Sequence, residues 1–322
     1  MKGNVQSIGR GPENSGPLRS WFLMAAKDIK VNKAIYAIAI PGLLYYIIFH
    51  YAPMYGVIIS FKDYQQNLGI FGSKWVGFQQ YREFFGSIYA WRVIRNTLLI
   101  NLYSLIFCFP LPIVLALMLN EVRKMWFKKS VQTITYLPHF ISLVVTCGMI
   151  VDFVSSRGFI TNFVNMLTGS NYKNLLHEAQ LFRTIYIVSA LWKNIGWSSI
   201  IYLAAISGID MELYEAASID GAKKMRQLWH VTIPGIAPTI IILFIMEIGR
   251  MMTVGSDKII LLYNPVIYET ADVISSHVYR KGLVENDPSY SAAVGLFNSV
   301  INCILVYSAN WFSRRVSETS LF

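Results

Sequence analysis

Residues 214–235 read YEAASIDGAKKMRQLWHVTIPG and lie between two long apolar segments of the chain. The stretch is polar, and its three basic side chains, Lys223, Lys224 and Arg226, fall within four positions. An apolar chain has no need of such a segment for its own core. We therefore expect the stretch to lie outside the apolar part of the protein, where a soluble partner can contact it.

The residues around this stretch predict two short helices. Asp210 can cap the first helix, and Glu212 falls in its first turn, where a negative charge is favourable. Gly221 permits a sharp turn that a side chain would hinder. A second short helix over about 222–230 should then end before Pro234.

The composition predicts a membrane protein. Of the 322 residues, 54% are hydrophobic and only 14% are charged, whereas about 25% are charged in a typical soluble domain. The net charge is +10, but the basic residues do not form one dense patch beside aromatics, as single-strand binders require. They gather at the ends of apolar segments, which argues for the bilayer and against nucleic acid.

Six segments are long and apolar enough to cross a membrane, for which about 20 residues are needed. They are 35–60, 94–119, 131–154, 182–206, 237–256 and 291–312. If the N-terminus is cytoplasmic, the segments on that side hold 15 lysines and arginines, against 9 on the other side. Positive residues prefer the cytoplasm, so we expect both termini and residues 210–235 to lie there.

The domain organisation follows from these spans. Residues 1–33 form a cytoplasmic segment, in which 21–33 is either a helix along the membrane surface or an ordinary flank. Residues 34–313 form one six-helix membrane domain, and 314–322 a cytoplasmic tail. Residues 1–20 do not have the pattern of a cleavable signal peptide.

No catalytic or metal-binding motif is present. The sequence lacks G-x-x-x-x-G-K-[ST], H-E-x-x-H, C-x-x-C and G-x-S-x-G, so it offers neither an ATP-binding loop nor a familiar hydrolytic centre. The three cysteines lie in apolar segments and are interpreted as small buried hydrophobes. The five histidines are interpreted as structural. We expect no enzyme, no metal and no cofactor on this chain.

The polar stretch also carries a recognisable pattern. Glu215-Ala216-Ala217 is followed after three residues by Gly221, and after nine more by 231–234, with the sequence Val-Thr-Ile-Pro. This resembles the signature of permease subunits of ABC importers. The family more often has isoleucine and leucine at the two aliphatic positions, which is a mild departure.

The resemblance extends over about residues 30–312. Residues 72–85, 120–145 and 261–283 resemble the branch of binding-protein-dependent carbohydrate permeases that imports oligosaccharides derived from large polysaccharides. It implies an all-α integral membrane protein with the type I ABC importer permease fold, in a bacterial cytoplasmic membrane. The implied partners are a second permease, two ATPase subunits that hold ATP and Mg²⁺, and an extracytoplasmic solute-binding protein.

In that family the loop docks into a cleft of the ATPase. The resemblance therefore implies that the 210–235 loop couples this chain to ATP hydrolysis. The residues carried over are Glu215, Ala216, Ala217, Asp220, Gly221 and Pro234.

Span four carries candidate sugar contacts. Charged residues inside spans are costly and mark functional sites. In maltose-type relatives the sugar lies on the helices before and after the coupling loop. Lys193, Asn194 and Trp197 share one face at that depth, and they offer both the polar and the aromatic groups that a sugar needs.

Span five carries a second candidate set. Glu247, Arg250 and Met251 follow helical spacing and should share a face. Glu247 and Arg250 either contact substrate or neutralise each other within the helix. With Lys193 counted, one positive charge is in surplus, which would suit an acidic sugar.

Two other functions remain open at this point. One is a permease of the same family for a solute that is not a sugar. The other is a membrane enzyme acting on lipid-linked glycans. The sequence also leaves open whether this subunit or its partner holds the sugar.

Overall fold

The computed structural model describes residues 28, 31–252 and 255–316. The surface helix expected over 21–33 falls largely outside these residues, as does the tail expected over 314–322. The chain divides into two compact units, residues 1–58 and 59–322, and each is described by itself.

The first unit is dominated by one long apolar helical stretch, Lys33–Phe61, whose last residues, 59–61, are assigned to the second unit. Its parts are α2 (Lys33–Tyr46), the π-helix η1 (Ile47–Tyr51), α3 (Ala52–Met54) and the 3₁₀-helix η2 (Tyr55–Phe61). Most side chains of α2, η1 and α3 are exposed, as expected of a helix whose neighbours are lipid or another chain.

The second unit starts with a short hairpin and continues into a long helix. Its first elements are β1 (Lys62–Asp63), α4 (Gly69–Gly72), β2 (Lys74–Trp75) and α5 (Gln79–Gly86). The antiparallel strands pair Lys62 with Trp75 and Asp63 with Lys74. The long helix runs from Ile88 to Glu121 as α6 (Ile88–Tyr103), the π-helix η3 (Ser104–Cys108) and α7 (Pro110–Glu121).

The third predicted span is broken rather than continuous. It consists of α8 (Met125–Tyr136) with the 3₁₀-helix η4 (Leu137–Phe140), followed by α9 (Leu143–Phe153), at an angle of 101°. Two residues account for the break. Pro138 cannot donate a backbone hydrogen bond, and the Ser142 side chain caps α9 by accepting from the Val145 amide at 3.3 Å.

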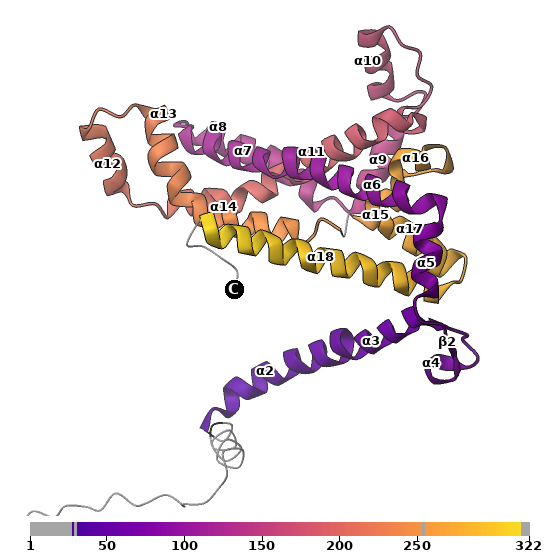
Figure 1. Cartoon of the computed structure of the whole chain (residues 1–322). Helices are drawn as coiled ribbons and strands as arrows, with labels where there is room; N and C mark the ends of the chain where they lie inside the picture. The colour runs from indigo at the N-terminus through magenta and orange to yellow at the C-terminus, as the bar shows by residue number, and fades with distance from the viewer. Residues whose placement is uncertain (1–27, 29–30, 253–254, 317–322) are drawn as a thin grey trace, which may run out of the picture. The chain divides into compact units, whose positions relative to one another are not determined.

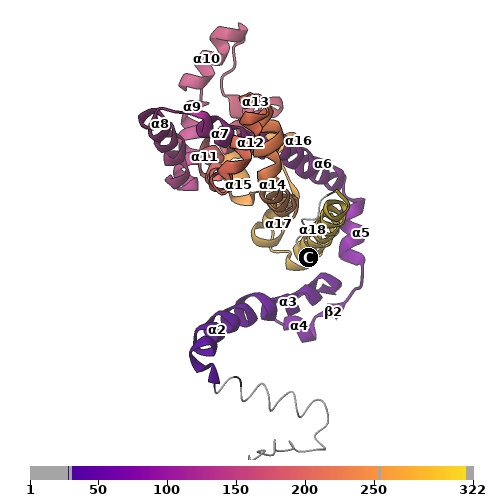
Figure 2. The same ribbon diagram turned by 90° about the vertical axis from the view of Figure 1, so that its left-hand side faces the viewer.

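Helix α10 (Phe159–Thr168) and the 3₁₀-helix η5 (Leu175–His177) lead to α11 (Ala179–Ser207). Helix α11 packs along α7 (Figure 2). Gly196 permits a close approach of α11 to α8, since a Cβ there would lie 2.3 Å from the carbonyl oxygen of Thr135. The core beside α11 contains the buried residues Phe182, Tyr186 and Ile259.

Helix α12 (Met211–Ile219) is followed by a helical stretch from Lys224 to Ile248. This stretch comprises α13 (Lys224–Gln227), the π-helix η6 (Leu228–Thr232) and α14 (Ile233–Ile248). We expected the second short helix to end before Pro234. It instead continues into span five. Proline is tolerated here because it occupies the first turn of α14.

The remaining elements carry the chain back along the bundle. They are α15 (Ser256–Leu262), η7 (Pro265–Ile267), α16 (Tyr268–Ala271), α17 (Ile274–Tyr279), η8 (Arg280–Val284) and α18 (Pro288–Val316). In Figure 1, α12 and α13 lie at one end of the long helices, and α16 and α17 lie at the other.

Among the described residues, four helices are long and apolar enough to cross a membrane, or five if α8–α9 is one bent span. Helix α11 is long enough but is not among them, and it contains the charged residues Arg183 and Lys193. The prediction of a largely helical membrane protein is confirmed, while the count of six spans stays a prediction.

Candidate functional site

The turn that contains Gly221 has the geometry that closes a helix. Gly221 has a φ of 75°. Its amide donates to the Ser218 carbonyl at 3.0 Å, and the Ala222 amide donates to the Ala217 carbonyl at 2.9 Å. These are the two hydrogen bonds of a Schellman cap, in which glycine is strongly preferred. The predicted cap at the other end is also present, since Asp210 accepts from the Glu212 amide at 3.0 Å.

The two arms of the 210–235 loop are tied together. The Tyr214 hydroxyl lies 3.0 Å from the Thr232 hydroxyl, and the Gln227 amide donates to Ser218 Oγ at 2.8 Å. Lys224 forms an ion pair with Glu121, the last residue of α7. The loop is therefore a fixed shape attached to span two, although it lies almost entirely on the surface.

The surface of this loop carries large, exposed apolar side chains. Ile219 is 87% exposed and Trp229 is 61% exposed, and Met225, between them in sequence, is also exposed. Exposed apolar groups of this size, ringed by charge, mark a contact with another protein. The loop residues singled out from the sequence lie on or beside this surface: Glu215, Ala216, Asp220, Gly221 and Pro234 are exposed, and Ala217 is half-buried.

A second candidate site surrounds the break in the third span. Lys193 of α11 donates to the carbonyl oxygens of Pro138 and His139, each at 3.3 Å, and to that of Ile141. The Pro138 carbonyl also accepts from the Ile141 amide at 3.2 Å, and the ammonium group gives all three carbonyls a charged donor at the break. Lys193 therefore holds the break in place.

The other two predicted residues of span four meet at the same break. The ring of His139 stacks on Trp197, with centroids 4.5 Å apart and planes 1° from parallel. His139 Nδ1 lies 3.2 Å from Asn194 Oδ1. Asn194 and Trp197 are exposed, so the cluster presents an amide, an imidazole and an indole edge, which suit the hydroxyls and ring faces of a sugar.

His139 was not predicted as a site residue, because a single histidine in an apolar segment is usually structural. A signal was present in the sequence. Pro138 indicates an irregular helix. Irregular backbone at membrane depth is tolerated only where it is buried in protein or lines a water-filled cavity.

The residues predicted on span five lie where that helix ends. Glu247 is exposed in the last turn of α14, whose final residue is Ile248. The next turn continues irregularly, with the Arg250 amide bonded to the Glu247 carbonyl at 3.0 Å. Arg250 is exposed and Met251 is half-buried. The three therefore do not share one continuous helical face, because the regular helix stops between them.

At the opposite end of the helices from the 210–235 loop lies a buried ionic cluster, which we call the Asp272 cluster: Arg92, Asp272, Ser276, His277 and Arg280. Asp272 is 0% exposed. Its carboxylate pairs with Arg280 at 2.7 Å and with Arg92 at 3.3 Å, and it accepts from Ser276 Oγ at 2.9 Å.

The environment of the Asp272 cluster shifts the pKa values of two of its members in opposite directions. Burial disfavours the charge on Arg280, but the hydrogen bonds and the charge of Asp272 outweigh it, so the pKa of Arg280 is raised. Burial lowers the pKa of His277 to about 4. His277 is therefore neutral near pH 7, and the cluster is a structural ion pair network that fixes α16 and α17 against α6.

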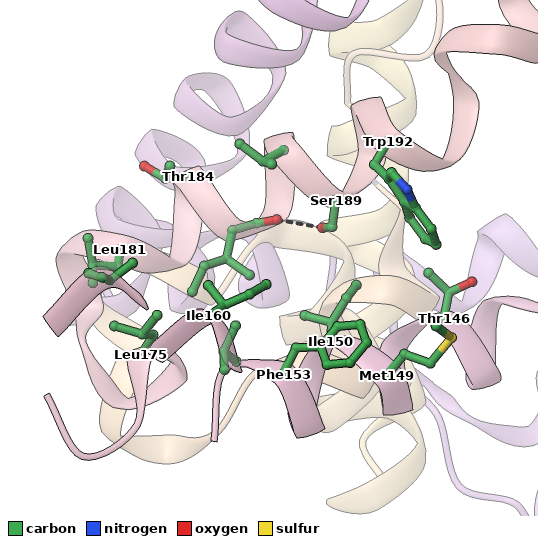
Figure 3. A pocket seen from close by; sticks show the side chains of 14 residues that line it. Thr146, Met149, Ile150, Phe153, Ile160, Leu175, Leu181, Thr184, Ser189 and Trp192 are labelled. Carbon is green, nitrogen blue, oxygen red and sulfur yellow. Dashed lines mark hydrogen bonds between the residues drawn. The ribbon is translucent and has the colours of Figure 1, made fainter. Parts of the chain in front are cut away.

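A cavity of about 510 Å³ lies between α9, α10 and α11 (Figure 3). Its walls are almost wholly apolar: Met149, Ile150, Phe153 and Trp192 face it, and the Ser189 hydroxyl turns away to donate to the Ile185 carbonyl at 2.5 Å. A sugar needs convergent polar groups, so this cavity suits an apolar occupant. Its lining does not include His139, Asn194 or Trp197, which we call the His139 cluster.

Comparison with known proteins agrees with these features. Residues 108–318 match the family model of the binding-protein-dependent transport system inner membrane component. Protein LplB of Bacillus subtilis (strain 168) is 42% identical over 304 residues, which cover 94% of each chain. The polygalacturonan/rhamnogalacturonan transport system permease protein YteP of the same organism is 40% identical, over 90% of this chain and 91% of YteP.

A solved structure is similar over nearly its whole length. A chain of the bacterial alginate ABC transporter, crystallised in complex with an alginate pentasaccharide-bound periplasmic protein, superposes with a TM-score of 0.84. It is 42% identical, and the match covers 92% of this chain and 99% of that chain. The sequence match spans more than half of the chain, and the fold is shared, so this protein belongs to the family of inner membrane components of binding-protein-dependent transport systems.

Proposed function

We propose that this chain is one of two permease subunits of an ATP-driven importer of oligosaccharides derived from acidic, uronate-containing polysaccharides. The observation that carries the proposal is the joint likeness to YteP and to the alginate transporter, each at about the same identity over nine-tenths of the chain. The names of both relatives refer to acidic polysaccharides, which favours an acidic oligosaccharide over a neutral one.

The 210–235 loop is the part that would couple the permease to ATP hydrolysis. Its fixed turn at Gly221 and its exposed apolar side chains favour docking into a cytoplasmic ATPase. In this proposal ATP and Mg²⁺ bind to the two ATPase subunits, and this chain performs no catalysis. An extracytoplasmic solute-binding protein delivers the sugar, and a second permease completes the pathway.

The proposal includes six spans with both termini in the cytoplasm of a bacterial cell. In that arrangement α11 and the bent pair α8–α9 each cross the bilayer, although α11 is the least apolar of the spans. The basic residues of the 210–235 loop would face the cytoplasm, and α16 and α17 would face outside.

The sugar would contact the His139 cluster at the break of span three. Asn194 and His139 can exchange hydrogen bonds with hydroxyls, and the indole edge of Trp197, whose face is stacked on His139, can pack against a sugar ring. Arg250 is exposed beyond the end of α14, and in this proposal its guanidinium group would bind a carboxylate of the sugar. Lys193 would act indirectly, because its ammonium group already serves the carbonyls of the break.

Transport in proteoliposomes tests the function. The complete transporter, with its ATPase and solute-binding protein, should transport labelled oligogalacturonide only when ATP is present on the side of the membrane that carries the ATPase subunits. Uptake of a neutral maltooligosaccharide at an equal rate, or no uptake of either sugar, would contradict the proposed substrate class.

Thiol labelling tests the topology. A cysteine in place of Lys224 should resist an impermeant thiol reagent in intact cells, whereas a cysteine in place of Glu285 should react. Both residues are exposed, so access is decided by the side of the membrane. The reverse pattern would overturn the arrangement with both termini inside.

A further inference from the structure

Two arginines near the Asp272 cluster are not neutralised by it. Arg183 donates to Asn96 Oδ1 at 2.8 Å, and Arg95 reaches the Glu269 carbonyl oxygen at 3.5 Å. Neither forms an ion pair with a carboxylate among the residues that the structure describes. Arg92 and Arg280, by contrast, share the carboxylate of Asp272.

The two guanidinium groups converge on one place. Asn96 accepts from Arg183 and donates to the Glu269 carbonyl at 2.9 Å, and Arg95 approaches the same carbonyl. Two cations so close repel each other where water is scarce. The buried Nε–H of each arginine also has no acceptor in the described part of the chain, which leaves hydrogen-bonding capacity unused.

Arg183 also lines a cavity of about 400 Å³ between α6, α7 and α11. This volume falls within the range of ligand pockets. The cavity has polar groups at its Arg183 end, from Gln180 and Thr184, and the aromatic rings of Tyr103 and Phe107 along α6 and η3. A sugar is recognised by this combination, with ring faces on aromatic side chains and hydroxyls on polar ones.

Helical geometry places Arg183 in line with the His139 cluster. Arg183, Asn194 and Trp197 lie at positions i, i+11 and i+14 of α11, which brings them to one face of a helix with 3.6 residues per turn. At 1.5 Å per residue, Arg183 lies roughly 16 Å from Asn194 along the helix, toward the end that carries α16 and α17.

We propose that Arg95 and Arg183, with the cavity that Arg183 lines, form an outer binding site for a carboxylate of the incoming oligosaccharide. This rests on the proposed function. A uronate carboxylate placed between the two guanidinium groups neutralises their charge and accepts hydrogen bonds from their terminal N–H groups. The sugar residue that carries it stacks on Tyr103 or Phe107, while the rest of the chain extends along α11 toward Asn194 and Trp197.

The test uses the complete transporter in proteoliposomes with two probes of equal length, an oligogalacturonide and its neutral methyl ester. Arg95→Gln and Arg183→Gln, alone and together, should raise the apparent KM for the acid by about tenfold or more. They should leave the KM for the ester unchanged. Arg183→Lys should recover part of the loss, because it keeps the charge but not the forked geometry.

A matched control removes a positive charge elsewhere on the same side. Arg157 is exposed in the loop between α9 and α10, and Arg157→Gln should leave both KM values unchanged. Arg95→Gln keeps the test valid if Arg183→Gln fails to assemble, because the hydrogen bond from Arg95 to the Glu269 carbonyl is long, at 3.5 Å, and its removal should not unfold the protein.

The carboxylate could instead come from an acidic side chain of the solute-binding protein. Stimulation of ATP hydrolysis by sugar-free solute-binding protein separates the two sources. If both arginine variants weaken this stimulation and slow the acid and the ester alike, the site binds the protein rather than the sugar, and our assignment is wrong. An unchanged KM for the acid in the double variant would also overturn it. Failure of the wild type to transport either probe would count against the proposed function instead.

Discussion

The 210–235 loop and the Asp272 cluster lie at opposite ends of the long helices, and they are stabilised by different kinds of contact. In the loop, the cap at Asp210 and the turn at Gly221 depend on hydrogen bonds between residues at most five positions apart. In the Asp272 cluster, Arg92 of α6 pairs with a carboxylate 180 positions later. The loop is exposed, whereas Asp272 is fully buried.

This difference determines what each region can do. A loop whose turns are shaped by local bonds can stay exposed and still present a fixed face to a soluble partner. A buried ionic cluster has no such face, but it sets how helices distant in sequence are arranged. We therefore expect changes in the cluster to cost folding stability, and changes in the loop to cost coupling at constant stability.

The largest effect should come from Asp272→Ala. The substitution leaves the half-buried guanidinium groups of Arg92 and Arg280 without the fully buried carboxylate that pairs them, and breaking a buried pair costs about 3–5 kcal/mol. The unfolding temperature of the purified permease complex should fall sharply. Asp257→Ala removes an exposed carboxylate from α15 and should have little effect on the unfolding temperature. Equal losses in the two variants would show that the Asp272 cluster contributes no more to stability than an exposed carboxylate does.

A smaller loss of stability is expected from Gly196→Ala. The added Cβ would overlap the backbone of Thr135 in α8, and overpacking of this kind costs about 1–3 kcal/mol. Because α8 must move, His139 should also leave Trp197, and transport should fall with stability. Gly148→Ala is the matched control, since nothing lies within 4 Å of a Cβ there. Wild-type unfolding and transport by Gly196→Ala would contradict the close packing of α8 on α11.

The same contrast explains what could be predicted from the sequence. The cap at Asp210 and the turn at Gly221 were predicted correctly, because both depend on a few neighbouring residues. The break between Phe140 and Leu143 was not predicted. It is stabilised by Lys193, which is more than fifty positions away from Pro138 and His139 and donates to the carbonyl oxygens of both.

The same limit applies to the candidate sugar site. Asn194 and Trp197 could be proposed from their spacing on one helix. Their partner His139 could not, because it reaches them only through the break in another helix. Likewise, helical spacing over Glu247 and Arg250 could not show that α14 ends at Ile248.

The smallest effect on stability should come from the ion pair between Glu121 and Lys224. Both side chains are about half exposed, and exposed pairs contribute about 0.2–1 kcal/mol. Glu121→Lys and Lys224→Glu should leave the unfolding temperature nearly unchanged but lower the amount of sugar moved per ATP hydrolysed, because the loop loses its attachment to α7. The double swap should restore that ratio. If it does not, the ion pair has no role in positioning the loop.

The coupling role of the 210–235 loop is tested most directly by the amount of ATPase that the permease retains when Gly221 is changed. Gly221→Val places a β-branched side chain at a φ of 75°, which such residues rarely adopt. Gly221→Asn keeps the turn, because asparagine tolerates this conformation. At equal permease levels in the membrane, we expect Gly221→Val to lose the ATPase on purification and Gly221→Asn to keep it. Full retention by Gly221→Val would contradict the assignment of the 210–235 loop as the coupling element.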